Sequence, residues 1–277
     1  MNHHHDTVHI DHSLDVLPQL LLGLPFIIGI VLYLMAIILS KRKGRPWKKY
    51  RTSLWTIGSV ISLIAVVDPL VTAAHENFFI HMLGHLLLGM LGPLLMVLGA
   101  PITLLLRALP ITQARQITTI LRSRPIHFLS NPIVPAILNI GGLWLLYTTD
   151  LFFLMETSVW IHIIVHFHVF LAGYFFAAML LYIDPIPIRY SYLYRSLVLI
   201  AALAGHKILS KYIYAYPPTG VSREEAEAGG MLMYYGGDLV DIAIIIILCY
   251  HWYQATKPRL SYDESKENKQ SISDASY

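Results

Sequence analysis

Cysteine and charge are both scarce in this 277-residue chain. The single cysteine, Cys249, excludes a disulfide framework and any cysteine-based zinc or iron–sulfur site. Charged residues make up 13% of the chain, against about 25% in soluble domains, so an ordinary water-exposed surface cannot be built. The net charge of +3 gives no sign of nucleic-acid binding. This composition excludes a cytosolic enzyme or a nucleic-acid binder and leaves one polytopic membrane domain.

Long apolar runs, by contrast, are abundant. Hydrophobic residues make up 56% of the chain and the mean hydropathy is +0.57. Runs of about 20 apolar residues predict helices that cross a membrane. We expect an all-α bundle of seven transmembrane helices, at 17–39, 53–71, 78–98, 132–149, 160–183, 196–214 and 238–254. The shorter, proline-rich run 99–110 is expected to continue the third span along the interface.

The positions of the basic residues predict which way the spans face. All of the 20 Lys and Arg residues except Lys207, Lys211 and Arg223 fall in alternate connections or in the C-terminal tail. Because basic residues favour the cytoplasmic side, we expect the N-terminus outside and the C-terminus in the cytoplasm. The expected organisation is an extracytoplasmic tail rich in His and Asp (1–16), the membrane domain (17–254) and a polar cytoplasmic tail (255–277).

Histidines are concentrated toward the outer side of this predicted topology. Spans three and five each open with two histidines four residues apart, a spacing that places both rings on one helix face. His206 in span six lies at a similar depth, roughly 12 Å below the outer end, although on its own it could be a structural hydrogen bonder. Ionisable groups inside a bilayer are costly and indicate function. The pattern predicts a joint metal site, with His81, His85, His162, His166 and His206 as candidate ligands.

Four further residues are weaker candidates for this site: His75, Asp238, Met231 and Met233. The two methionines precede span seven in an expected outer loop, and thioether ligands favour Cu(I), which tilts the metal toward copper. Imidazole also suits zinc and iron, so zinc and haem stay open. His168 faces away from the paired histidines and is expected to be structural. The tail histidines His3, His4, His5, His9 and His12 could form a metal-collecting arm or simply a solvated tail.

A family resemblance rests on motifs that occur in order along the chain. They are HMLGHLLLGMLGPLLMVLGAPITLLLRALP, LSNP at the start of span four, His162 and His166 with FLAGYFF, IDPIPIR, Arg195, His206 and MYYGGD. Over residues 17–254 the chain resembles the CtaG family, polytopic assembly factors of caa3-type cytochrome c oxidase in Gram-positive bacteria. The resemblance implies a multi-pass protein of the bacterial plasma membrane that helps to make active oxidase, through delivery or insertion of copper. It also implies oxidase subunits as partners, beside membrane lipid, and no nucleic acid.

Three hypotheses follow from the sequence. The first is a copper-handling assembly factor that is not an enzyme. The second is a seven-span zinc hydrolase acting on a lipid amide or ester, in which a zinc-bound water is the nucleophile and Asp238 or Glu76 the general base. The third is an outer-leaflet haem-binding protein with axial histidines from two helices.

Overall fold

Residues 12–258 are described here from a computed structural model, with side chains from residue 16 onward. The predicted tails lie mostly outside the described residues, so the candidate arm formed by His3, His4, His5, His9 and His12 is not placed. Within the described part the chain is all-helical, without a strand. The all-α prediction is confirmed.

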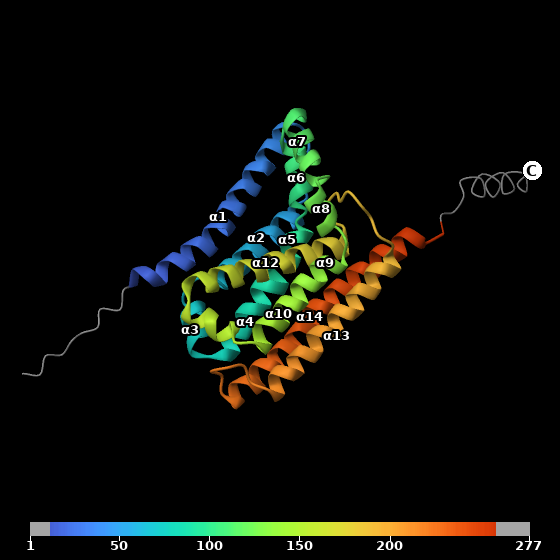
Figure 1. Cartoon of the computed structure of the whole chain (residues 1–277). Coiled ribbons are helices and arrows are strands. Elements are labelled where there is room, and N and C mark those ends of the chain that lie inside the picture. Colours follow the sequence, from blue (N-terminus) through green and yellow to red (C-terminus); the bar gives the residue numbers. More distant parts are fainter. Residues whose placement is uncertain (1–11, 259–277) are drawn as a thin grey trace, which may run out of the picture.

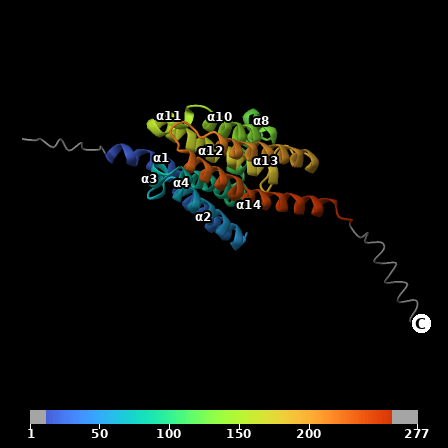
Figure 2. The same ribbon diagram turned by 90° about the horizontal axis from the view of Figure 1, so that it is seen from below.

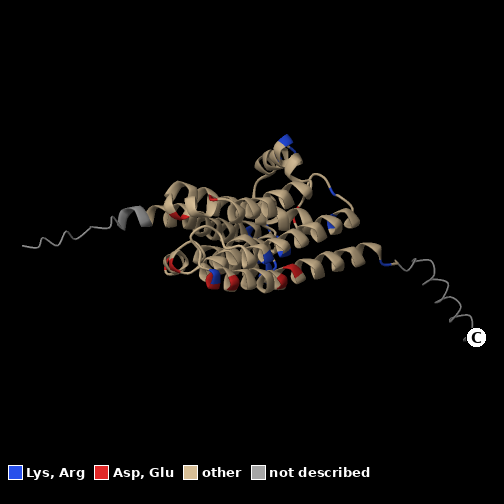
Figure 3. Cartoon of the chain, turned by 60° about the horizontal axis from the view of Figure 1, so that its bottom comes forward, with Lys and Arg blue, Asp and Glu red and all other residues tan. Residues whose placement is uncertain are grey.

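Five apolar segments are long enough to cross a membrane. They are α1 (His12–Arg42), the continuous segment Phe78–Leu98, α12 (Val159–Leu181), α13 (Tyr192–Ala215) and α14 (Arg223–Thr256). The segment Phe78–Leu98 consists of α4 (Phe78–Leu86), the π-helical turn η1 (Leu87–Leu91) and α5 (Gly92–Leu98). The protein is therefore a multi-pass membrane protein, and most of its ribbon carries no charge (Figure 3).

A sixth candidate span is bent. It begins with α9 (Ile133–Ala136), the π-helical turn η2 (Ile137–Gly141) and α10 (Gly142–Thr148), and then turns by 80° into α11 (Leu151–Thr157). The predicted span 132–149 corresponds to its straight part. The π-helical turns in this segment and in Phe78–Leu98 are of a kind that frequently accompanies functional sites.

The predicted span 53–71 is not a single helix. α2 (Lys49–Ile64) has 16 residues, about 24 Å of helix, and is shorter than the hydrocarbon core. After Ile64 the chain turns, and α3 (Leu70–Glu76) begins beyond Asp68 and Pro69. Proline has no N–H to continue a helical hydrogen-bond series, which accounts for the break. The number of spans is therefore five or six by helix length and composition, and a seventh stays a prediction.

The last helix begins fifteen residues before its predicted start. α14 starts at Arg223, where the Ser222 hydroxyl accepts a hydrogen bond from the Glu225 N–H and the Glu225 carboxylate accepts one from that hydroxyl. Ser222 is therefore the N-cap of α14, and Ser-x-x-Glu is the sequence signature of a helix start. The predicted outer loop that carries Met231 and Met233 is therefore helix, and the expectation of a loop there was wrong.

The helices pack as a bundle (Figure 1, Figure 2), and its two ends differ in the charged residues that they carry. At one end, the acidic end, lie α3 and α11 with Asp68, Glu76, Asp150 and Glu156. At the other, the basic end, lie the α1–α2 connection, α6 (Pro101–Ala108), α7 (Ile111–Leu121) and α8 (Arg124–Leu129). The outward face of α1 is apolar and exposed, as expected of a helix in contact with lipid. The predicted continuation of the third span is interrupted at Ala100, whose φ of 53° ends α5 and lets α6 begin.

α12 crosses η1 at a backbone contact between two glycines. A Cβ atom on Gly173 would lie 1.9 Å from the carbonyl oxygen of Gly89, so only glycine fits at position 173. Val169, one turn earlier on α12, covers the other side of Gly89, where an added Cβ would lie 2.8 Å from its methyl group. This crossing brings the histidines of α4 and α12 to the same level of the bundle.

Candidate metal site

A cavity near the acidic end gathers five histidines and one carboxylate. Here called the histidine cavity, it is lined by His75 of α3, His81 and His85 of α4, Glu156 of α11, and His162 and His166 of α12. About 30 Å³ of its space is open to the centre of a water molecule, enough for a metal ion or about two waters. The i,i+4 spacing on α4 and α12 turns each pair toward the same space.

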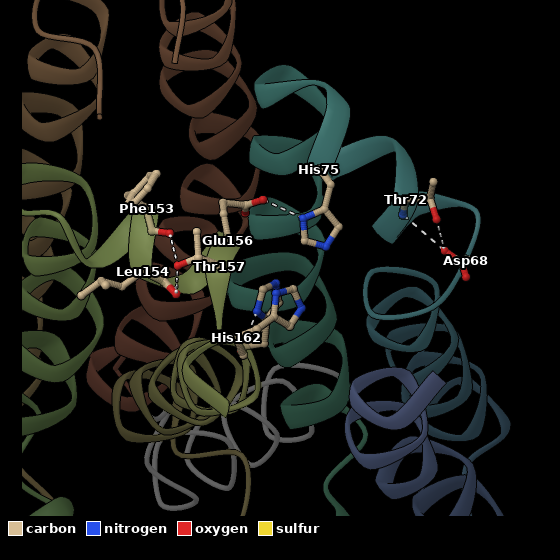
Figure 4. A network of polar contacts seen from close by, with 9 residues as sticks. Asp68, Thr72, His75, Phe153, Leu154, Glu156, Thr157 and His162 are labelled. Carbon is tan, nitrogen blue, oxygen red and sulfur yellow. Dashed lines mark hydrogen bonds and ion pairs between the residues drawn. The ribbon is translucent and has the colours of Figure 1, made fainter. Parts of the chain in front are cut away.

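The histidines nearest the acidic end form a chain of contacts that starts at Glu156 (Figure 4). The Nδ1 atom of His75 lies 2.6 Å from the Glu156 carboxylate. The ring of His75 lies 5.5 Å from that of His162, which stacks on His166 at 4.0 Å between ring centres. Nδ1 of His166 lies 2.9 Å from the His162 carbonyl oxygen, so its N–H donates there and its Nε2 stays an acceptor. An acceptor nitrogen is the form of imidazole that ligates a metal.

The two histidines of α4 lie deeper and are buried. The Nε2 of His81 lies 3.1 Å from the Tyr147 hydroxyl of α10. The Nε2 of His85 is buried and has no hydrogen-bond partner within residues 12–258. A buried polar atom without a partner costs free energy unless a water or an ion satisfies it. His85 therefore offers a nitrogen to whatever occupies the cavity.

An acidic hollow leads into the histidine cavity. This vestibule, of about 650 Å³, shares His75, Glu156 and His162 with the cavity, and its lining also includes Asp68 and Glu76 but neither Lys nor Arg. Asp68 accepts hydrogen bonds from the Thr72 hydroxyl and from the Gln19 amide, each at 2.6 Å. These bonds hold the pKa of Asp68 below its usual value, so the carboxylate stays charged. The vestibule therefore attracts cations.

The imidazoles are near one another but do not converge on one point. Within residues 12–258, no group of three or more His, Cys, Asp or Glu side chains is arranged to hold a metal ion. The joint metal site thus stays a prediction. Four of its five predicted ligands, and the weaker candidate His75, line one cavity.

The fifth candidate, His206, lies elsewhere. It is buried in a second cavity with Asp241 of α14 and Asn139 of η2, apart from the other histidines. The sequence places His206 at a similar depth, but the direction in which its side chain points depends on packing.

The remaining weaker candidates also lie away from the histidine cavity. Met233 is fully buried in the apolar core with Met82, whereas Met231 is exposed on α14. Asp238 pairs with Lys207 of α13. His168 points away from the cavity, and its Nε2 lies 3.0 Å from the Leu138 carbonyl of η2.

Two neighbours of the histidines have no role in the sequence-based hypotheses. They are Glu156, which contacts His75, and Tyr147, which contacts His81. A carboxylate beside histidines in a membrane protein can indicate a metal site, because carboxylates often orient ligating histidines. No pattern in the sequence, however, links Glu156 to His75, 81 residues away.

The fold and the site define an all-helical, multi-pass membrane protein with a histidine-lined cavity near one end. The chain belongs to the family of cytochrome c oxidase caa3 assembly factors, which matches residues 31–255. This confirms the resemblance seen in the sequence motifs.

Relatives with similar sequences come from mycobacteria. An uncharacterized protein of Mycobacterium leprae is 28% identical over 254 residues, which cover 84% of this chain and 38% of the relative. Uncharacterized proteins of Mycobacterium bovis and Mycobacterium tuberculosis are each 32% identical over 188 residues, 64% of this chain and 28% of theirs. The chain thus spans well under half the length of these relatives. No solved structure matches it.

Proposed function

We propose that this protein serves the assembly of caa3-type cytochrome c oxidase by holding copper in the histidine cavity and passing it to oxidase subunits. Copper is the cargo here and no reaction is catalysed. The observation that carries the proposal is the gathering of five histidines from three helices around one small cavity, with the Nε2 of His85 buried and without a partner in the described chain.

The chemistry of the lining suits a transient copper site. Imidazole binds copper well in either oxidation state. The Glu156 carboxylate contacts Nδ1 of His75, the kind of second partner that orients a ligating histidine. Since the rings do not yet converge, binding requires rotation of the imidazoles, and the same freedom favours release. A site that must give up its ion needs exchangeable ligands.

The predicted topology supports a transfer at the outer face of the membrane. If the N-terminus is outside, as the Lys and Arg distribution predicts, the acidic end and its vestibule face outward. The vestibule carries three carboxylates and so concentrates cations before they reach the histidines. The partners are then the oxidase subunits that receive copper on this side, with membrane lipid around the bundle.

The test is the copper content of the oxidase in cells that make variants of this protein. We expect His81→Ala and His162→Ala to lower the copper per purified oxidase severalfold while its haem spectrum is unchanged. His168→Ala is the matched control, because His168 is on α12 but contacts the Leu138 carbonyl outside the cavity. Immunoblots establish that all variants accumulate equally. Wild-type copper loading in both cavity variants would refute the proposal.

A zinc hydrolase is the second candidate, because a carboxylate lies at the histidine cavity itself. Glu156, rather than Asp238 or Glu76, is the acid that lines it and would be the general base. Elemental analysis of the detergent-purified protein separates the two candidates. Copper lost in the His81→Ala/His162→Ala variant supports the assembly role, whereas zinc together with chelator-sensitive lipid hydrolysis supports the enzyme. A Soret band would instead support the haem hypothesis.

A further inference from the structure

A second cavity lies one helical turn deeper in the bundle. α10 and α12 line both cavities. Val169 of α12 lines the histidine cavity and Gly173, four residues on, lines the second, while Leu146 of α10 lines the first and Leu143 the second. Four residues of helix correspond to about 6 Å along the axis. Between the two levels, the His85 ring and the Val169 methyl group pack over Gly89 of η1.

Two ionisable side chains reach this second cavity from the neighbouring helices α13 and α14. His206 of α13 and Asp241 of α14 are 3% and 4% exposed. The Nε2 of His206 and the Oδ2 of Asp241 are buried, and neither has a hydrogen-bond partner within residues 12–258. The cavity lining includes no Lys or Arg. A carboxylate and an imidazole with unsatisfied atoms inside a membrane bundle are costly, so a ligand that satisfies both is favoured.

The helix packing makes room for this arrangement. The His206 ring lies against Gly237 of α14, where an added Cβ would come within 2.7 Å of the ring carbon Cε1. Gly237 is one turn before Asp241, so the ring lies near the face of α14 that carries the carboxylate. Asn139 of the π-helical turn η2 adds an amide to the lining.

The neighbouring basic residue does not neutralise this site. Lys207, next to His206 on α13, pairs with Asp238 on the partly exposed side of α14 and lies 4.3 Å from the centre of the Tyr234 ring. Neither Lys207 nor Asp238 lines the second cavity, but the charges of both act on His206 and Asp241 from nearby.

We infer that His206 and Asp241 form a second cation site, independent of the histidine cavity, for a divalent first-row transition-metal ion. One imidazole nitrogen, one carboxylate oxygen and the Asn139 amide oxygen make a nitrogen/oxygen donor set, with positions left for water, and such a set suits a divalent ion better than Cu(I). The space open to a water's centre, about 20 Å³, accommodates one ion. Among these ions Cu²⁺ binds most tightly to a given donor set, which makes it the probe of choice.

The experiment counts Cu²⁺ ions retained by the detergent-purified full-length chain after a wash with a weak chelator. All samples carry alanine at the five histidines of the N-terminal tail (positions 3, 4, 5, 9 and 12), so that the tail binds nothing. We expect Asp241→Asn and His206→Ala each to weaken one Cu²⁺ site about tenfold or more. Glu227→Gln is the matched control, since Glu227 is on the same helix but pairs with Arg223 at its start, and it should leave that site unchanged.

The outcomes also separate this inference from the proposed function. Loss of one ion on Asp241→Asn, both in the otherwise unchanged chain and in the His81→Ala/His162→Ala background, supports the second site whether or not the histidine cavity binds copper. Equal Cu²⁺ retention in wild type, Asp241→Asn and His206→Ala would overturn it and leave the two residues as a proton-bearing or water-bridged pair. Because Asn is nearly isosteric with Asp, an unchanged thermal unfolding midpoint will exclude misfolding, and Gly237→Ala, which displaces the His206 ring, gives an independent variant.

Discussion

The two cavities of this bundle differ in their donors, their access and the way the fold builds them. The histidine cavity holds five imidazoles beside one carboxylate and opens to an acidic vestibule. The second cavity has a single imidazole, a single carboxylate and an amide among apolar side chains and glycines. In the first, the donors come mainly from histidine pairs within helices. In the second they come from three different segments, η2, α13 and α14, and meet only because the helices pack there.

The difference indicates that the two cavities suit different tasks. A cluster of neutral nitrogens with rotatable rings beside open solvent suits rapid exchange of an ion. A carboxylate site in a small apolar cavity favours a bound charge, because no Lys or Arg lines it to compensate Asp241. Four changes, taken from the largest expected effect to the smallest, test how far the two sites are separable.

Gly173→Ala should disturb both cavities at once. The added Cβ would lie 1.9 Å from the Gly89 carbonyl oxygen, so α12 must move away from η1. We expect the free energy of unfolding to fall by about 3 kcal/mol or more, the upper end of the cost of overpacking, with loss of Cu²⁺ from both sites. Denaturant titration in detergent measures the first and metal analysis the second. Gly141→Ala is the control, because its Cβ would meet only Ile137, at 3.7 Å; similar losses in both variants would contradict the prediction.

Glu156→Gln should weaken the histidine cavity alone. The carboxylate holds His75 through Nδ1, and loss of such a partner of a ligating histidine typically costs 10–100-fold in metal affinity. Copper titration should show a shift of about that size at the histidine cavity and none at the His206–Asp241 site. Glu227→Gln is the control, since Glu227 pairs with Arg223 at the start of α14. Equal affinities in both variants would show that Glu156 does not orient a ligand.

Asp68→Asn with Glu76→Gln should slow access to the histidine cavity without changing its affinity. Removing two of the three vestibule carboxylates lowers the local cation concentration, and we expect the association rate for Cu²⁺ to fall about threefold at low salt. The effect should vanish near 1 M salt, where charges are screened within about 3 Å. Hydrogen bonds from Thr72 and Gln19 lower the pKa of Asp68, so its contribution should persist to lower pH than that of an ordinary aspartate. Stopped-flow fluorescence measures the rate.

Asp184→Asn should affect neither cavity. Asp184 lies at the basic end and accepts hydrogen bonds from the N–H groups of Ile102 and Thr103 and from the Thr103 hydroxyl, which fix the start of α6. Burial raises the pKa of Asp184, and these hydrogen bonds counteract the shift. We expect a loss of about 1 kcal/mol in stability, typical of a helix cap, and unchanged Cu²⁺ retention. Reduced copper in this variant would mean that the two ends of the bundle are coupled.

Hydropathy and spacing predicted much of the fold and part of the site. The expected span 78–98 coincides with the segment Phe78–Leu98, and 160–183 differs from α12 by only one or two residues at each end. The pairs His81/His85 and His162/His166 line one cavity because their helical spacing fixes which face they share.

The features that sequence reasoning missed depend on backbone irregularity and on packing between distant segments. The first half of α14 contains Glu224, Glu225 and Glu227, so hydropathy does not register it, although Ser222 and Glu225 carry a capping signal. Gly230 lets this half approach α13 closely, with an added Cβ only 2.9 Å from the Ser210 carbonyl. The separation of His206 from the other histidines follows from which way α13 turns, which periodicity within one helix does not specify.

The glycine contact between η1 and α12 also affects how an ion could exchange between the two cavities. The backbones of η1 and α12 are in direct contact at Gly89 and Gly173, so the two helices are closely packed there. On the side of the histidine cavity, the side chains of Val169 and His85 fill the space over Gly89. An ion that moved between the two cavities would therefore require rotation of the packed side chains of His85 and Val169 rather than a helix rearrangement in microseconds to milliseconds. Exchange between the two levels would then be set by how tightly each site holds its ion, and the rate of copper release from the protein would report affinity rather than opening of the bundle.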